Sequence, residues 1–132
     1  MKVSKTYDWV MGHRLMSNQG ECVNPHGHNY VAEVEIEGQL NLEGMVLDFK
    51  DIDAIVKPIW GRLDHSFMVY QKDQELVSVL SGRGWKTTEV DFESTAENIA
   101  RYLFDLVRAS GINVSKIKVW ETPKCAATYE GK

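Results

Sequence analysis

Three of the four histidines in the chain stand at positions from which their side chains can converge. His26 and His28 lie two residues apart in the stretch CVNPHGHNY, so in an extended strand both imidazoles point to the same face. His13 is the last residue of an earlier alternating segment, and its side chain should point to the same face as the apolar residues of that segment. If the two segments pair as a hairpin, the three imidazoles meet, and three histidines with an open fourth position are typical of catalytic zinc sites. The alternative is that each histidine is satisfied singly by hydrogen bonds.

Cys22 stands four residues before His26, in the loop that enters the predicted strand. A thiol close to Zn²⁺ and histidines loses its proton readily, so Cys22 is a candidate base, nucleophile or metal ligand. A small buried thiol without a chemical role is the alternative. The other cysteine is Cys125, and two cysteines are too few for a disulfide scaffold.

A carboxylate and an imidazole are adjacent in LDHSF, where Asp64 precedes His65. In a loop the carboxylate can orient the imidazole, which then serves as a general acid–base. Such a dipeptide also occurs as an ordinary surface or capping pair, and the residues alone leave both interpretations open.

Glu121 is an acidic residue at a position of its predicted strand where the alternation calls for an apolar side chain. It continues the pattern of Ile117 and Val119, so its side chain should point inward, where a carboxylate needs a partner. The partner is either a lysine or arginine, or a ligand with two parallel N–H donors, such as the amino-pyrimidinone edge of a guanine or pterin. If the strand ends at this residue, the side chain reaches solvent instead.

Alternating polarity predicts the strands, and a 3.6-residue period predicts the helices, that must position these side chains. In residues 28–37 apolar side chains alternate with glutamates, so one face is buried and the other faces water. The predicted strands are 3–13, 28–37, 116–121 and 126–129, and the predicted helices are 49–60 and 95–109. The order β-β-α-α-β-β indicates an α+β fold with a four-stranded antiparallel sheet and two helices on one face.

The helix ends are predicted from capping residues. Asp48 is the expected N-cap of the first helix, and Pro58 is expected to kink or end it. Ser94 and Glu97 have the spacing of a capping box at the start of the second helix. Residues 81–91 are predicted to form a loop or an irregular hairpin.

Chain length and charge restrict the classes of function. A chain of 132 residues is expected to form a single domain, residues 1–132. The net charge of −4 argues against general binding of nucleic acid or anionic membranes. No apolar run is long enough to span a membrane, and the N-terminal residues lack the apolar stretch of a signal peptide. We therefore expect a cytoplasmic protein whose cysteines are free thiols or ligands.

Taken together, these residues resemble the 6-pyruvoyltetrahydropterin synthase / 6-carboxytetrahydropterin synthase family. The resemblance runs from the first predicted strand to the last. The matching stretches are GHRL (12–15), CVNPHGHNY (22–30), GMVLDF (44–49), LDH (63–65), STAENIA (94–100) and VWET (119–122). The short spacing from Cys22 to His26, and GMVLDF, look more like the bacterial 6-carboxy-5,6,7,8-tetrahydropterin synthases of queuosine synthesis. The family often has proline where this chain has Ser94, and residues 78–91 are hard to place against its pattern.

The resemblance implies a tunnelling fold, or T-fold. Three subunits would close their sheets into a barrel, and two rings would stack into a homohexamer with active sites at subunit interfaces. Zinc is the implied cofactor. The implied roles are metal ligand for His13, His26 and His28, catalytic thiol for Cys22, proton-transfer partners from a neighbouring subunit for Asp64 and His65, pterin anchor for Glu121, and a place near the pterin pocket for Thr95 and Glu97.

The implied reaction converts 7,8-dihydroneopterin triphosphate into 6-carboxy-5,6,7,8-tetrahydropterin and releases acetaldehyde and triphosphate. Arg14 and Lys124 are candidates, by position alone, for binding the triphosphate. One alternative is elimination of triphosphate only, as in the pyruvoyl-forming enzymes. Another is a non-catalytic zinc-binding member of the family, with Cys22 as the simplest fourth ligand. A third is aldolase chemistry on unphosphorylated neopterin with the same fold.

Overall fold

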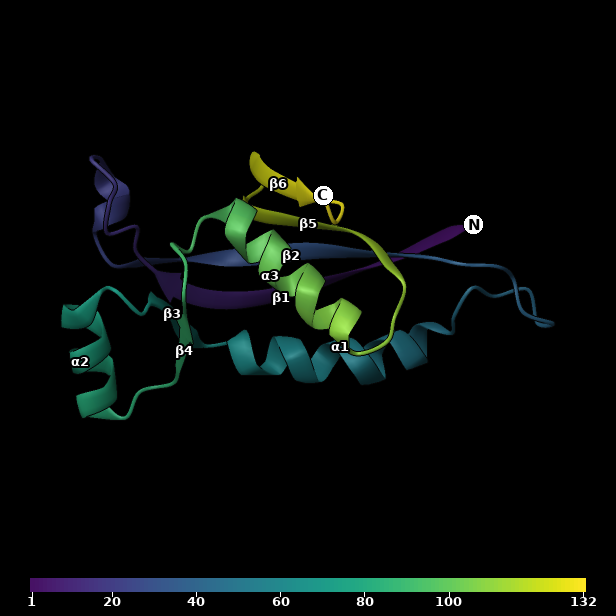
Figure 1. Ribbon diagram of the computed structural model, residues 1–132, viewed down its shortest axis with the longest axis horizontal. Helices are drawn as coiled ribbons and strands as arrows, with labels where there is room; N and C mark the ends of the chain where they lie inside the picture. The colour runs from purple at the N-terminus through teal and green to yellow at the C-terminus, as the bar shows by residue number, and fades with distance from the viewer.

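The alternating segment at the N-terminus forms β1, Lys2–His13, and the second alternating segment forms β2, His26–Glu37. The two strands pair antiparallel along their whole length, and His13 lies opposite His26. The computed structural model describes residues 1–132, and Figure 1 shows these long strands running through the middle of the molecule. The hairpin on which the histidine prediction depends is therefore present.

Four more strands complete one sheet of six, in the order β4-β3-β1-β2-β5-β6. On the β2 side, β5 and β6 continue the sheet antiparallel. On the other side, β3 runs parallel to β1 and pairs with it only at Met11 and Gly12, and β4 runs parallel to β3. The bounds are Ser66–Tyr70 for β3, Thr87–Val90 for β4, Val114–Thr122 for β5 and Cys125–Tyr129 for β6.

Two helices, α1 (Phe49–Leu63) and α3 (Ala96–Ala109), cover one face of the sheet (Figure 1). The core lies between these helices and the buried parities of the central strands. Trp9 of β1 stacks on Tyr30 of β2 with ring centroids 5.0 Å apart, and Trp60 of α1 meets Trp9 edge-on at 5.9 Å. The predicted helix-covered face of the hairpin is therefore confirmed.

The α+β fold class is confirmed, but the prediction of four strands and two helices is too low. The missed strands β3 and β4 have only five and four residues, too few to show a clear alternation. The missed helix α2, Gln74–Arg83, lies at one end of the molecule beside β3 and β4 (Figure 1). It buries only Leu80, so its sequence shows no helical repeat of apolar residues from which a helix could be predicted. Residues 81–91 therefore contain the end of α2 and all of β4 rather than only a loop or hairpin.

Of the two predicted N-caps, one is confirmed and the other is wrong. Asp48 caps α1, because its carboxylate accepts the Lys50 N–H at 2.8 Å. Pro58 does not end α1, which continues to Leu63 although proline cannot donate a backbone hydrogen bond. The N-cap of α3 is Thr95, which accepts the Asn98 N–H, so the prediction of a capping box beginning one residue earlier is wrong.

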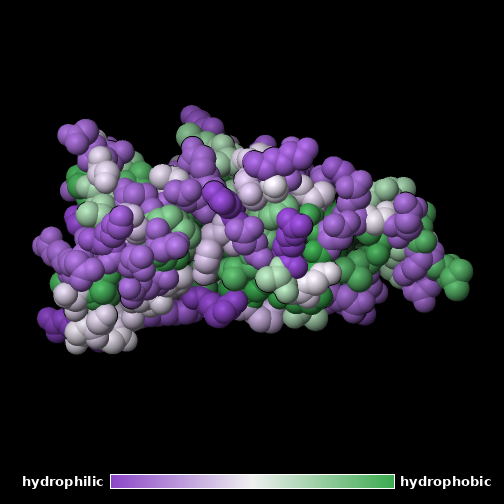
Figure 2. All heavy atoms as spheres, viewed as in Figure 1, coloured by the Kyte–Doolittle hydropathy of each residue, from purple (hydrophilic) through white to green (hydrophobic).

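The face of the sheet that carries no helix is lined by charged side chains. Lys116 of β5 pairs with Glu33 at 2.8 Å and with Glu35 at 3.2 Å, both on β2. Figure 2 shows the opposite side, where hydrophobic atoms reach the surface at the end from which residues 38–48 project. None of the helices has the length and apolar composition needed to cross a membrane.

Candidate active site

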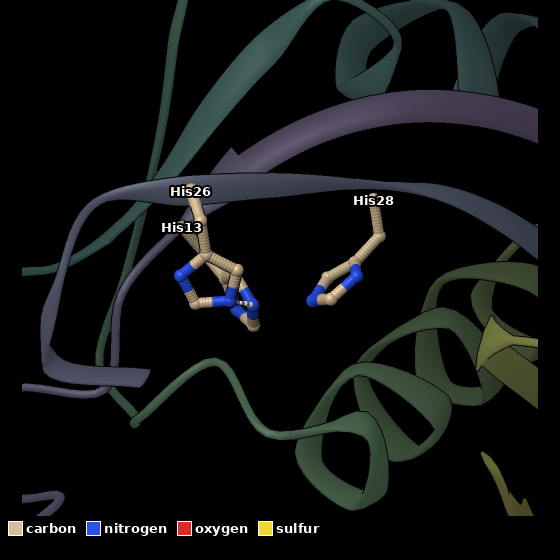
Figure 3. A group of neighbouring side chains, drawn as sticks. All are labelled: His13, His26 and His28. Atoms are coloured by element: carbon tan, nitrogen blue, oxygen red, sulfur yellow. Dashed lines mark hydrogen bonds between the residues drawn. The ribbon is translucent and has the colours of Figure 1, made fainter. Parts of the chain in front are cut away.

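The register of the β1–β2 hairpin brings the three predicted metal ligands together. His13 lies directly opposite His26, and His28 lies two pairs further along, opposite Met11. One donor nitrogen from each of the three rings lies within 4.8 Å of the others. Figure 3 shows the imidazoles extending from the two strands toward a common region beside the start of α3. The three histidines therefore form a cluster that could hold one metal ion.

Backbone carbonyls fix how two of these rings are protonated. His13 Nδ1 lies 2.8 Å from the carbonyl oxygen of Ser94, and His26 Nδ1 lies 2.6 Å from that of Asn24. Because a carbonyl only accepts, each Nδ1 carries the proton and donates it. In the neutral rings Nε2 is then unprotonated and turned toward the cluster, the arrangement common among metal-bound histidines.

The Nε2 atoms of His13 and His26 lie 3.1 Å apart. With both Nδ1 atoms protonated, two nitrogen lone pairs face each other, which is unfavourable unless a cation or proton lies between them. Two nitrogen ligands on one tetrahedral zinc ion lie about 3.3 Å apart, given Zn–N distances of about 2.0 to 2.1 Å. The observed separation therefore fits two ligands of a shared ion.

Burial favours the neutral form of two histidines of the cluster, His13 and His28. His13 is 1% exposed, and its desolvation lowers the pKa of the ring to about 4, although the hydrogen bond to Ser94 opposes the shift. Desolvation also lowers the pKa of His28, against the opposite effect of the Glu121 charge. Neutral imidazole is the form that binds metals, so these rings need not lose a proton first.

Glu121 lies half-buried on β5, on the core-facing parity that the sequence predicts. It lies near the histidine cluster, because its charge acts on His28 and, after burial, is the second cause that raises the pKa of Tyr30. It forms no ion pair and no side-chain hydrogen bond within the chain, so no lysine or arginine of this chain is its partner. The carboxylate is therefore available to accept hydrogen bonds from a ligand.

Cys22 lies outside the cluster of nitrogen donors. It is exposed, in the 3-10 helix η1 (Glu21–Val23) of the loop between β1 and β2. The base of this loop is held by a hydrogen bond from the Leu15 N–H to the Cys22 carbonyl at 2.8 Å. The carboxylate of Glu93 also accepts the N–H groups of Met16 and Ser17, at 3.3 and 3.2 Å. The thiol is thus carried by an anchored loop beside the histidine hairpin.

Asp64 and His65 form a hydrogen-bonded pair at the C-terminal end of α1. The Asp64 carboxylate accepts from His65 Nδ1 at 3.0 Å through one oxygen and from the Val10 N–H at 3.0 Å through the other. This backbone hydrogen bond is the main cause that lowers the pKa of Asp64. His65 in turn donates its own N–H to the Val10 carbonyl at 2.8 Å, and it is the one residue other than glycine with positive φ, at 60°.

The Asp64–His65 pair does not join the histidine cluster within one chain. Both side chains are largely open to solvent, with 42% of Asp64 and 75% of His65 exposed. Val10, to which the pair is attached, has the opposite parity on β1 to His13. The pair therefore stands at the edge of β1, where a neighbouring molecule could meet it.

Residues 2–132 match the family described as 6-pyruvoyl tetrahydropterin synthase. The chain belongs to this family. The match spans the hairpin with the three histidines, the Asp64–His65 pair and Glu121, so the family assignment covers every part of the candidate site.

Curated relatives within the 6-pyruvoyl tetrahydropterin synthase family carry the carboxy-forming name. The 6-carboxy-5,6,7,8-tetrahydropterin synthase of Haemophilus influenzae is 38% identical, and the match covers 98% of this chain and 98% of that protein. The Rickettsia bellii protein of the same name is 34% identical over 95% of this chain and 96% of its own length. These relatives are lyases, and the chain is an enzyme of that class, with a reaction of the tetrahydropterin synthase type.

Solved structures show the same fold. An uncharacterized protein from Wolinella succinogenes matches with a TM-score of 0.85 and 24% identity, over 100% of this chain and 98% of that one. The 6-pyruvoyl tetrahydropterin synthase of Caenorhabditis elegans matches with a TM-score of 0.74 and 26% identity, over 100% of this chain and 96% of its own. The T-fold that the family resemblance implies is therefore confirmed.

The remaining candidate residues differ in how far they are free to bind a substrate. Thr95 is half-buried and uses its hydroxyl to cap α3, while Glu97 is exposed in the first turn of that helix. Arg14 is committed to Asp73, because its Nε and one terminal nitrogen reach the two carboxylate oxygens at 2.6 and 2.7 Å. This pairing argues against Arg14 as a triphosphate ligand. Lys124 is exposed in the turn between β5 and β6 and forms no ion pair.

Sequence reasoning missed two contacts that shape the site. Ser94 accepts from His13 Nδ1 through its carbonyl oxygen, and its hydroxyl lies 3.0 Å from the same nitrogen. The backbone of Val10 holds the Asp64–His65 pair. Both contacts are made by main-chain atoms far away in sequence, so residue type and spacing carry no signal for them.

Proposed function

We propose that this chain converts 7,8-dihydroneopterin triphosphate into 6-carboxy-5,6,7,8-tetrahydropterin, with zinc as cofactor, and releases acetaldehyde and triphosphate. The observation that carries the proposal is the cluster of three histidines with two Nε2 atoms 3.1 Å apart, beside a carboxylate without a partner. The carboxy-forming name of the relatives from Haemophilus influenzae and Rickettsia bellii supports this outcome.

His13, His26 and His28 would hold the zinc ion through their ring nitrogens. When bound, zinc supplies Lewis acidity toward the hydroxyl groups of the substrate side chain. The donor set fits this role, because three histidines leave a tetrahedral ion one position for substrate. Cys22 is not among the clustered donors, which disfavours a closed structural zinc site with a sulfur ligand.

The chain's own side chains supply binding and proton transfer. Glu121 would accept two parallel N–H groups of the pterin ring and so fix the position of the reacting side chain. Cys22 and His65 would take up and return protons at the substrate carbons, and Asp64 would hold the His65 ring by accepting from Nδ1 at 3.0 Å. Thr95 and Glu97, at the start of α3, would border the pterin pocket.

The proposed site is complete only when chains associate. The edge of β1 is paired with β3 only at Met11 and Gly12, and the outer edge of β6 has no partner strand in the chain. Open edges of this kind favour pairing with another chain. We propose that three copies of the domain formed by residues 1–132 close into a barrel and that two barrels form a hexamer. The Asp64–His65 pair would then meet the histidine cluster of a neighbour. The cytoplasmic location stays a prediction.

Product analysis tests the reaction. Zinc-loaded protein is incubated with 7,8-dihydroneopterin triphosphate, and the products are separated and weighed by mass spectrometry, with Cys22→Ala as the paired variant. Acetaldehyde and a 6-carboxypterin mass, both lost in the variant, are the expected result. A 6-pyruvoyl product without acetaldehyde would instead support the alternative reaction, which the structural likeness to the Caenorhabditis elegans enzyme favours. Stable zinc binding without turnover would overturn both.

A further inference from the structure

Lys86 closes the C-terminal end of α1. Its ammonium donates to the carbonyl of Gly61 at 2.7 Å and to the carbonyl of Asp64 at 2.6 Å. The last carbonyls of a helix have no partner within the helix, and a cation there is favoured by the helix dipole. Lys86 comes from the segment between α2 and β4, which resembles the family least clearly.

The carbonyl that Lys86 binds belongs to Asp64 itself. The peptide group joining Asp64 to His65 is therefore held at its carbonyl by Lys86 and at its N–H by the Val10 carbonyl, while the Asp64 carboxylate accepts the Val10 N–H. His65 sits in the left-handed region, at φ 60°, where residues other than glycine rarely stay without support. These contacts together set the direction in which the imidazole leaves the chain.

The main chain around Lys86 is well placed to transmit this support. Its carbonyl accepts the Phe67 N–H at 3.0 Å, and the Thr88 hydroxyl lies 3.0 Å from the hydroxyl of Ser66. The first contact joins Lys86, just before β4, to β3, and the second joins β4 itself to β3, the strand that begins directly after His65. Lys86 thus links the strand that follows the Asp64–His65 pair to the helix that precedes it.

We propose that Lys86 is a positioning residue for the Asp64–His65 pair: it fixes the backbone from which the proposed acid–base imidazole projects. The effect of Lys86 on catalysis rests on the proposed function, in which His65 transfers protons. Lys86 is exposed, so the effect comes from the geometry of its two hydrogen bonds more than from its charge, which water and salt screen. The residues between α2 and β4 thereby gain a role in positioning the proposed acid–base pair.

The test compares Lys86→Met, which keeps most of the length of the side chain and removes its donors, with Lys86→Arg, which restores two or more donors. Lys50→Met is the matched control, because Lys50 is exposed at the opposite end of α1 and its side chain forms no hydrogen bond or ion pair. Each protein is measured for zinc content, for kcat and KM, and for hydrogen–deuterium exchange in the peptide that spans residues 63–67. Lys86→Gln, which is shorter and uncharged but keeps an amide N–H group, replaces Lys86→Met if that variant does not fold.

Lys86→Met is expected to lower kcat about tenfold with KM and zinc content unchanged, because a misplaced general acid–base slows the reaction without weakening binding. Hydrogen–deuterium exchange at residues 63–67 should rise in Lys86→Met. Lys86→Arg should restore kcat and exchange most of the way to their wild-type values. A Lys86→Met enzyme with wild-type kcat would overturn the inference and leave the proposed function standing. No turnover by the wild-type protein would overturn the proposed function, and with it the catalytic meaning of Lys86, even if exchange responds.

Discussion

His13 and His26 face each other across the β1–β2 hairpin with their Nε2 atoms 3.1 Å apart and both Nδ1 protons donated to backbone carbonyls. This pairing follows directly from strand register, because the two residues are cross-strand partners and their rings leave the same face. It leaves two lone pairs in contact, an arrangement that a shared metal ion relieves.

Replacing one of these rings should release the metal. His26→Ala is expected to weaken zinc binding by at least about a hundredfold, since even residues behind the ligands change metal affinity by 10- to 100-fold. Zinc per chain after dialysis against a competing chelator measures the effect. His65→Ala is the control and should keep its zinc, because His65 lies outside the cluster. Equal zinc loss in both variants would contradict the assignment of ligands.

Substitution of Glu121 should separate pterin binding from metal binding. Glu121→Gln keeps the size of the side chain but removes the charge, and a charge-assisted hydrogen bond contributes roughly 1.5 to 3 kcal/mol. We expect KM to rise about 10- to 100-fold while zinc content stays the same. Glu130→Gln, an exposed change on the C-terminal segment, should leave KM alone. An unchanged KM in Glu121→Gln would mean that the carboxylate reaches solvent.

The two exposed cysteines offer a matched pair for testing the thiol. Both are free, one in the loop beside the histidine hairpin and the other at the start of β6. Cys22→Ala is expected to lower kcat by about 10² to 10⁴, the usual contribution of a proton-transferring group, with zinc content unchanged. Cys125→Ala should retain wild-type turnover. X-ray absorption at the zinc edge should show no sulfur at about 2.3 Å in the wild-type protein.

The ion pair between Arg14 and Asp73 should make stability depend on pH in acid. Asp73 is 4% exposed, and the hydrogen bond from Arg14 is the main cause that lowers its pKa below the ordinary value of 3.8. A lowered carboxyl pKa contributes stability that is fully present above 3.8 and is lost as the pH falls through the lower value of the folded state.

Asp73→Asn should therefore reduce the free energy of unfolding by roughly 1.5 to 3 kcal/mol at pH 7, since it removes the charged acceptor of the Arg14 hydrogen bonds. The difference between wild type and variant should shrink as the pH falls below 3.8. Urea titrations at several pH values measure it. Asp91→Asn, an exposed change without an ion pair, should give no such trend; a constant deficit in Asp73→Asn at all pH values would contradict the explanation.

The core under α3 should respond strongly to truncation. Leu103 is fully buried between α3 and the sheet, and removing such a side chain costs roughly 2 to 5 kcal/mol, depending on how well the cavity closes. Leu103→Ala should lower the midpoint of chemical unfolding accordingly. Leu42→Ala, in the projecting 38–48 segment, removes the same atoms from an exposed side chain and should change stability by less than about 0.5 kcal/mol.

Strand parity predicted the two long strands and their buried face, and the convergence of the histidines followed on the assumption that the strands pair as a hairpin. Period-two alternation assigns Trp9 and Tyr30 to the core and His13 to the same side. The antiparallel register then places His13 opposite His26. The T-fold itself came from the family motifs. Helix caps are less certain because neighbouring residues compete: Ser94 has the spacing of a cap, but Thr95 takes that position and Ser94 turns inward to His13.

The missed parts of the fold lack a periodic signal. Three of the five residues of β3 are buried and two of these are adjacent, so burial does not alternate along the strand, and α2 buries only Leu80. The placement of the Asp64–His65 pair depends on Val10, which lies 54 residues before Asp64. Such a contact depends on the packing of α1 against β1 and cannot be inferred from local spacing.

All three histidines of the cluster belong to one hairpin near the start of the chain, closed by residues 14–25. During synthesis these side chains leave the ribosome before α1, α3 or the edge strands exist. A zinc ion bound by the nascent hairpin would fix the register of β1 and β2 while the rest of the chain is still being made. If the proposed zinc ion binds at this stage, the same three histidines would serve the assembly of the hairpin as well as the chemistry of the finished site.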